Sequence, residues 1–336
     1  MGRLKPLMVR QPRIFWRKNY IFALALALLL ALPFIFTARF QHHVMIKVLM
    51  FAFLGCAWNI IGGYTGQVAL GHAAFFGIGA YTSSLGYIWF GLNPWFGMLL
   101  GGILAVAVSA VINYPCFRLH GRYFAIATLA LGEIIRLLFT NWRLVGGALG
   151  VRLPLLPESL WNFQFHTTKL PYYYITLVLC ALIFALVYKI ERSKLGFYLR
   201  AIKESEEAAR SLGIDVAKYK LVAMSFSVFF TAMAGTIYAQ YILYIDPISV
   251  MPLMTSLLIC VVPVVGGAGT LWGPALGAPI LMVAIEYSRA WLGGGGRGVD
   301  YMIVGAMMVA IIFRPAGLIS FFQGPRFRQW WKRIRG

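Results

Sequence analysis

The amino-acid sequence predicts an all-α integral membrane protein, a polytopic helical bundle of about ten transmembrane helices with one helical cytoplasmic loop. Of its 336 residues, 60% are hydrophobic and only 12% are charged. The mean hydropathy of +0.77 leaves too little polar surface to cover a water-soluble globule. Its apolar runs are continuous, whereas the strands of a membrane β-barrel alternate apolar and polar residues. Runs of about 17 to 25 residues can cross about 30 Å of hydrocarbon as helices.

Each predicted span is an apolar run that ends at charged or turn-forming residues. The runs lie near residues 20–37, 44–62, 68–90, 95–117, 121–140, 171–189, 219–243, 252–268, 271–291 and 299–313. They divide the chain into a basic N-terminal segment (1–19), a transmembrane domain (20–313) with a polar loop at 190–218, and a basic C-terminal tail (314–336).

The distribution of Lys and Arg predicts the orientation, because loops rich in these residues stay on the cytoplasmic side. Most of the 30 Lys and Arg residues lie in the two termini, in the loop 190–218, and in the other loops on that same side. We therefore expect both termini and this loop to be cytoplasmic. The net charge of +20 then faces anionic lipid headgroups, so membrane lipid rather than nucleic acid is the expected partner.

The sequence carries no signature of a catalytic or metal site. Its four cysteines all lie in or beside apolar runs, without a CxxC pair. It has no GxSxG or HExxH motif, and no Gly-Lys dipeptide from which a phosphate-binding GxxxxGK[ST] loop could be built. We expect a non-enzymatic chain without metal or cofactor, which does not itself hydrolyse ATP.

The stretch RAIKESEEAARSLGIDVAKYK, residues 200–220, is the most polar part of the chain, with nine charged side chains. Nine charges at the bilayer centre would cost on the order of 20 kcal/mol, so this stretch must lie outside the membrane. Residues from Leu199 to Leu212 favour one helix of about 21 Å. Gly213 would end this helix and Asp215 would cap the next one.

One face of this predicted helix is apolar and is formed by Leu199, Ile202, Ala209 and Leu212. Such a helix could lie on the lipid headgroups as an ordinary solvated loop. Alternatively it could dock another protein, which the small side chains of Ala208 and Ala209 would allow to approach closely.

This stretch resembles the EAA-x-x-x-G core by which permease subunits of ABC importers contact their ATPases. Glu207, Ala208, Ala209 and Gly213 match the core. Four successive blocks resemble LivM-type permease subunits of branched-chain amino acid ABC importers: NIIGGYTGQVALGHAAFFGIGAYTSS (59–84), GRYFAIATLALGEIIRLLFTNW (121–142), LGFYLRAIKESEEAARSLGIDVAKYKL (195–221) and VVGGAGTLWGPALGAPIL (264–281).

The resemblance implies a machine of several subunits in the bacterial inner membrane. This chain would pair with a second, LivH-like permease. Two ATP-binding subunits would bind and hydrolyse ATP on the cytoplasmic side, and an extracytoplasmic solute-binding protein would deliver the solute. The residues implied in ATPase coupling are Leu199, Ile202, Glu207, Ala208, Ala209, Leu212 and Gly213.

A dense group of glycine and polar residues follows the second predicted span. Glycines at such density let helices pack closely, or let a span unwind and expose backbone groups to a cavity. Polar groups at membrane depth are costly unless they find a partner or face water. We expect a solute path bordered by Asn59, Gly66, Gln67, Gly71, His72 and Gly77, with close helix packing as the alternative.

Two acid–base pairs with the same spacing occur inside predicted spans, Glu133 with Arg136 and Glu286 with Arg289. Residues three apart share one helical face, so each pair can partly neutralise itself. The pairs could fix helix positions, or they could form an outer gate or a contact for a zwitterionic solute.

Three functions fit these observations. The first is the permease subunit of an ABC importer for branched-chain or related amino acids. The second is the same kind of permease carrying urea, an amide or another small solute. The third is an ion-coupled secondary transporter, which leaves the charged cytoplasmic helix without a role.

Overall fold

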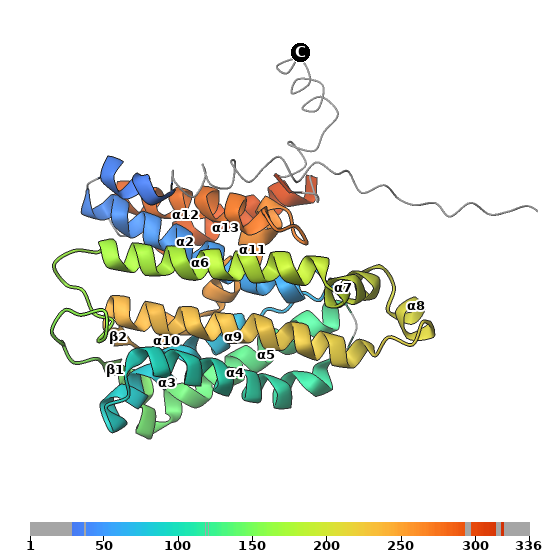
Figure 1. Ribbon diagram of the computed structural model, residues 1–336, viewed down its shortest axis with the longest axis horizontal. Helices are drawn as coiled ribbons and strands as arrows, with labels where there is room; N and C mark the ends of the chain where they lie inside the picture. Colours follow the sequence, from blue (N-terminus) through green and yellow to red (C-terminus); the bar gives the residue numbers. More distant parts are fainter. Residues whose placement is uncertain are drawn as a thin grey trace, which may run out of the picture.

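The computed structural model describes residues 29–36, 38–117, 119, 121–292, 297–313 and 317–318. The basic segment 1–19, most of the first predicted span and nearly all of the tail 314–336 lie outside these residues. The described chain is a bundle of long, roughly parallel and antiparallel helices (Figure 1). The prediction of an all-α membrane protein is confirmed at this level.

Among the described residues, nine named helices lie at the second to tenth predicted spans, and residues 29–35 of the first span are helical as well. The nine named helices are α2 (Arg39–Ile61), α3 (His72–Phe90), α4 (Pro94–Cys116), α5 (Arg122–Asn141), α6 (Leu170–Arg192), α9 (Val216–Ile242), α11 (Leu253–Gly266), α12 (Gly273–Trp291) and α13 (Arg297–Phe313). Among the described residues, six helical segments are long and apolar enough to cross a membrane: α2, α4, α5, α6, α9 and Pro247–Gly266. The total of about ten spans stays a prediction.

The two ends of the bundle differ (Figure 1). At one end, β1 (Val151–Arg152) pairs antiparallel with β2 (Tyr244–Ile245), and Val151 lies opposite Ile245. Short 3-10 helices, η1 (Arg143–Val145) and η2 (Gly147–Leu149), precede β1. The opposite end carries α7 (Lys194–Glu204) and α8 (Glu206–Ser211). We call these the sheet end and the α8 end.

A folded connection between β1 and α6 covers part of the sheet end. Glu158 anchors it by accepting hydrogen bonds from the Thr167 hydroxyl (2.8 Å) and from the backbone amides of His166 and Thr167. The hydrogen bonds from Thr167, and then that from the His166 amide, lower the pKa of this carboxyl. Trp95 at the start of α4 donates from its indole nitrogen to the Leu160 carbonyl at 2.8 Å.

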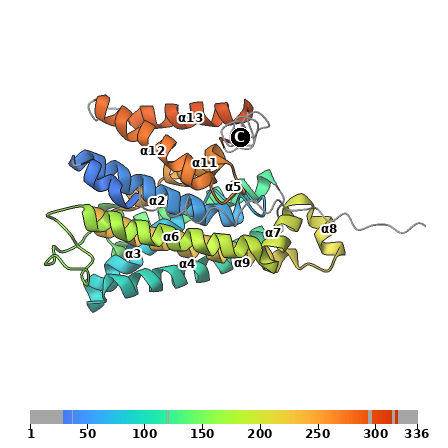
Figure 2. The same cartoon turned by 45° about the horizontal axis from the view of Figure 1, so that its top comes forward.

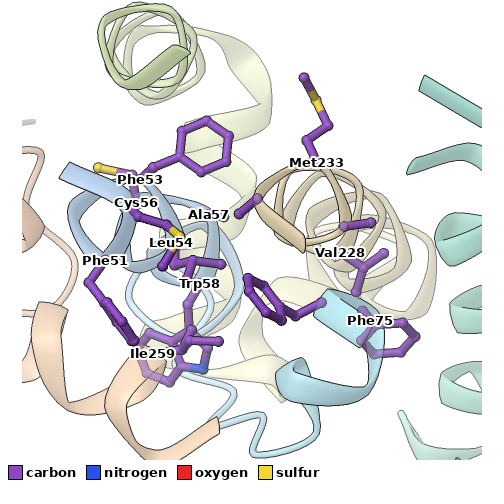
Figure 3. Packing of buried hydrophobic residues seen from close by; sticks show 14 of the residues in the cluster. Phe51, Phe53, Leu54, Cys56, Ala57, Trp58, Phe75, Val228, Met233 and Ile259 are labelled. Atoms are coloured by element: carbon purple, nitrogen blue, oxygen red, sulfur yellow. The ribbon is translucent and has the colours of Figure 1, made fainter. Parts of the chain in front are cut away.

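Helix α2 is the centre of the bundle, and Figure 3 shows its large side chains packed among neighbouring helices. It contacts α6, α9, α11 and α12, and most of its residues are buried. Trp58 is fully buried and donates from its indole nitrogen to the Ala69 carbonyl at 2.8 Å. Helix α5, in contrast, buries few residues in this chain, so most of its apolar surface is left for lipid or another subunit.

Small residues let α3 and α9 approach until their backbones touch. A Cβ added at Gly79 would lie 1.9 Å from the Ala232 carbonyl oxygen, and one at Gly235 would lie 1.9 Å from the Phe76 carbonyl oxygen. No side chain larger than hydrogen fits at either position without separating the helices. Close packing thus explains these glycines, as it does in other membrane bundles.

An interruption precedes the helix at the eighth predicted span, 252–268. Helix α10 (Pro247–Val250) is only four residues long, and α11 starts after Pro252. At about 1.5 Å per residue, the 14 residues of α11 extend about 21 Å, short of the hydrocarbon thickness. Pro252 cannot donate a helical backbone hydrogen bond, which accounts for the interruption at this position.

The single cytoplasmic helix expected from Leu199 to Leu212 is wrong, because the chain forms two helices, α7 and α8, with Ser205 between them. Ser205 has an extended backbone (φ −161°, ψ 117°), and its hydroxyl accepts from the Ala208 amide at 3.2 Å. The serine hydroxyl therefore takes a backbone amide that would otherwise donate within a continuous helix, and a new helix starts after Ser205. Two other predictions are confirmed: Gly213 adopts a left-handed φ of +80°, and Asp215 accepts from the Lys218 amide at 3.0 Å.

We expect Gly79→Ala to destabilise the bundle by about 1 to 3 kcal/mol or more, because the new methyl group meets rigid backbone rather than a side chain that can move. Thermal unfolding of the purified protein in detergent would measure this. Gly86→Ala on the same helix is the matched control, since its Cβ would lie 3.8 Å from the nearest atom, in ordinary contact. Equal melting temperatures for the two variants would contradict this packing.

Candidate functional site

The segment α7–α8 is tied to the rest of the chain by its apolar residues. Leu199, Ile202 and Ala209 are at most 2% exposed, and Ile202 and Ala209 pack against Val216 at the start of α9. Their apolar side chains are already buried within this chain and do not form the open docking face that the single-helix prediction gave them.

The side of α8 that remains exposed carries the other residues of the EAA-x-x-x-G core. Leu212 is 79% exposed, and Glu207, Ala208 and Gly213 are also exposed. Figure 2 shows α8 projecting beyond the ends of α6 and α9. The Leu212 side chain is therefore left uncovered by the described part of this chain.

Polar contacts join the same segment to the loop between α2 and α3. Lys203 donates from Nζ to the Gly63 carbonyl at 2.8 Å, and Gln67 donates from Nε2 to Glu206 Oε1 at 3.0 Å. Lys220 of α9, whose side chain is fully buried, donates to the same Glu206 oxygen at 2.5 Å. Glu206 is thus shared by the α2–α3 loop and α9, which couples α8 to both.

Asn59 connects the α2–α3 loop to the turn between α11 and α12. Its side-chain amide donates to the Thr270 carbonyl at 2.9 Å and accepts from the Gly269 amide at 2.8 Å. The two turns touch, because a Cβ added at Gly63 would lie 2.5 Å from the Gly269 nitrogen. Both polar atoms of the Asn59 side chain are therefore paired with the α11–α12 turn, while its backbone carbonyl accepts from the Gly63 and Tyr64 amides of the α2–α3 loop.

The remaining residues of the predicted solute path mostly lie at helix contacts. Gly71 approaches the Thr128 carbonyl of α5, from which an added Cβ would lie 2.4 Å away. His72 is fully buried, and its Nε2 lies 2.8 Å from the Ser227 hydroxyl. Gly66 has a φ of +75° beside Lys203, and Gly77 packs against the Met251 side chain. That these six residues border a path stays a prediction, and their contacts favour the alternative of close packing.

Two cavities flank the break between α10 and α11. The Glu133 cavity, about 360 Å³, is lined by residues of α3, α5, α10 and α11 that include Ala73, Gly132, Glu133, Arg136, Ile248 and Leu253. The Glu286 cavity, about 440 Å³, lies on the other side of the break. It is lined by residues of α2, α3, α9, α10, α11, α12 and α13 that include Lys47, Leu54, Ile248, Thr255, Glu286 and Arg289. The fold thus brings both predicted charge pairs to one interrupted segment.

The first charge pair is an ion pair within α5, as predicted. Arg136 donates from Nε to both carboxylate oxygens of Glu133, at 3.0 and 2.9 Å. The second pair has a closer partner that the sequence analysis missed. Lys47 of α2 donates to Glu286 Oε1 at 2.7 Å, whereas Arg289 lies 3.4 Å from the same atom. A lone lysine inside an otherwise apolar α2 was the available signal.

No group of three or more potential metal-ligating side chains occurs among the residues that the structure describes. The four cysteines are free thiols, three of them buried. The described residues thus contain a projecting charged segment, two glycine-containing turns that touch each other, and two cavities lined in part by charged residues.

Comparison with known proteins agrees with this geometry. Residues 42–312 match the family described as branched-chain amino acid transport system / permease component. The chain is 30% identical over 327 residues to the high-affinity branched-chain amino acid transport system permease protein LivM of Escherichia coli K12, covering 90% of this chain and 75% of the relative. The LivM protein of Salmonella typhimurium LT2 is equally similar, at 30% over 325 residues and the same coverage.

The second permease type of the same systems is also related. The LivH protein of Salmonella typhimurium LT2 is 24% identical over 288 residues, covering 80% of this chain and 91% of the relative. No solved structure matches significantly. The family match spans α2 to α13, so it includes the α8 segment, both glycine turns and both cavities. This chain therefore belongs to the permease components of branched-chain amino acid transport systems, and it is a LivM-type permease subunit of an ABC importer.

Proposed function

We propose that this chain and a second, LivH-like permease together form the path by which branched-chain or related amino acids cross the bacterial inner membrane. Two ATP-binding subunits would act on α7–α8, and an extracytoplasmic solute-binding protein would dock at the sheet end. The family match over residues 42–312 carries the proposal, since it spans every feature used here. In this proposal both chain termini are cytoplasmic, which the distribution of Lys and Arg favours, and the sheet end faces outward.

The contacts of α8 support a route for the energy of ATP binding. A partner that moved α8 through Leu212 would also move Glu206, and with it Gln67 of the α2–α3 loop. Lys203 would pull on the Gly63 carbonyl at the same time. Because Asn59 joins that loop to the α11–α12 turn, the displacement would reach the helices that line both cavities.

The solute class and the energy source can be tested together. The assembled complex in proteoliposomes should accumulate L-leucine only when ATP and the binding protein are both supplied. Uptake of leucine under an ion gradient without ATP would identify a secondary transporter instead. Transport of urea or a small amide, but not of leucine, would support an ABC permease with a different substrate.

Leu212→Ala should weaken ATPase association by roughly tenfold or more, because burying a leucine at an interface stabilises it by about 1.5 to 3 kcal/mol. Copurification of the ATPases with the tagged permease would measure the effect. Leu149→Ala is the matched control, since Leu149 is 87% exposed at the sheet end, away from α8. Undiminished copurification of the Leu212 variant would exclude α8 as the docking point.

Lys203→Met should separate ATP hydrolysis from transport. The substitution keeps the aliphatic stem but removes the hydrogen bond to Gly63, and hydrogen bonds to charged groups contribute about 1.5 to 3 kcal/mol. We expect solute moved per ATP hydrolysed to fall at least about tenfold while the ATPases stay bound. Lys218→Met, an exposed lysine nearby, should behave as wild type. A normal transport ratio in the Lys203 variant would show that this contact transmits nothing.

A further inference from the structure

The Glu286 cavity combines charged and apolar walls on different sides. Its charged wall is formed by Lys47 of α2 with Glu286 and Arg289 of α12. Glu286 and Arg289 belong to the last two turns of α12 toward the sheet end, and Lys47 lies eight residues into α2 from that end. The charges thus meet at the end of the bundle that the proposed function places outside.

Apolar side chains line the rest of the cavity. Met282 and Ile285 precede Glu286 on α12, on the side of the α8 end. Leu54 lies two turns after Lys47 on α2, also toward the α8 end. Leu258 contributes the wall from α11. A volume of about 440 Å³ falls in the range of pockets that hold small ligands, which is about 300 to 1,000 Å³.

The break between α10 and α11 borders the same cavity. Pro252, Met254 and Thr255, at and just after the break, all line it, and Thr255 contributes a hydroxyl group. Of the first amides of α11, that of Thr255 donates to the Pro252 carbonyl at 3.0 Å, whereas those of Leu253 and Met254 precede any carbonyl that the helix offers. A helix N-terminus also carries a partial positive charge that favours a carboxylate. In membrane transporters, interrupted helices supply backbone groups to a solute in this way.

The ion pair in the cavity wall restricts which solutes can enter. Glu286 is 6% exposed, and separating it from Lys47 would leave two poorly solvated charges. A solute with one ammonium and one carboxylate replaces both partners at once, whereas a neutral solute or one with a single charge leaves a charge unpaired. The second carboxylate oxygen of Glu286 lies 3.9 Å from His43 Nε2, beyond hydrogen-bond distance, which leaves it acceptor capacity for an ammonium.

We infer that the Glu286 cavity is a binding site within this permease for zwitterionic α-amino acids with aliphatic side chains. Glu286 receives the ammonium group, Lys47, Arg289 and the start of α11 receive the carboxylate, and Leu54, Leu258 and Met282 contact the side chain. This inference rests on the proposed function, in that the solute reaches the cavity on its way through the chain. It adds selection by the permease itself to that of the binding protein.

A cysteine-protection experiment on the assembled complex tests the site directly. Thr255→Cys places a thiol in the Glu286 cavity, and Leu253→Cys, two residues earlier, places one in the Glu133 cavity. L-leucine should slow methanethiosulfonate labelling at position 255 by at least about tenfold and leave position 253 unaffected. N-acetyl-L-leucine, which lacks the ammonium, and 3-methylbutylamine, which lacks the carboxylate, should protect position 255 much less than leucine.

Two variants extend the test. In the Thr255→Cys background, Glu286→Gln should make leucine and N-acetyl-L-leucine protect position 255 from labelling to the same extent. Should the loss of Glu286 prevent folding, Met254→Trp fills the cavity without altering a charge and should lower ATP-driven leucine uptake at least about tenfold. Met307→Trp, partly buried on α13 and outside the cavity lining, is its matched control.

The outcomes separate this inference from the proposed function. A complex that takes up leucine normally, yet shows no protection at position 255 or equal protection by all three compounds, overturns the zwitterion site and leaves the permease function intact. Protection at position 253 instead would move the site to the Glu133 cavity. A wild-type complex that never transports leucine overturns the proposed function itself.

Discussion

Asn59, in the last turn of α2, holds together two places where the backbone leaves the helical conformation, the loop after α2 and the turn after α11. Backbone amides and carbonyls that are buried in a membrane must find partners inside the protein. The loop after α2 and the turn after α11 meet this requirement by packing on each other, with Asn59 bonded to Gly269 and Thr270. The α7–α8 segment then attaches to the same loop through Lys203. Every part of the proposed transmission depends on this junction.

Among the residues that the structure describes, Lys220 and Glu286 are the two buried charged side chains, and each is paired with a residue of another helix. Lys220 of α9 meets Glu206 of α8, and Lys47 of α2 meets Glu286 of α12. An unpaired charge at these depths would cost several kcal/mol, so breaking either pair requires a replacement.

The sequence predicted the positions of nine helices well, because a long apolar run has few alternatives to a helix in a membrane. It predicted the pairing of Glu133 with Arg136 because residues three positions apart share one face of a helix. It could not reveal that Lys47 meets Glu286, because that contact depends on how α2 packs against α12. The kink at Ser205 was also missed, because capping by a serine competes with helix propensity too evenly to be decided locally.

Helix α10 and the start of α11 form a wall shared by the two cavities, with Ile248 and Pro252 lining both. A displacement of this short segment therefore enlarges one cavity at the expense of the other. Substitutions around Glu133 and around Glu286, although they lie on opposite sides of the wall, would consequently not act independently. A substitution that impairs one cavity can therefore be suppressed by a second substitution in the other cavity.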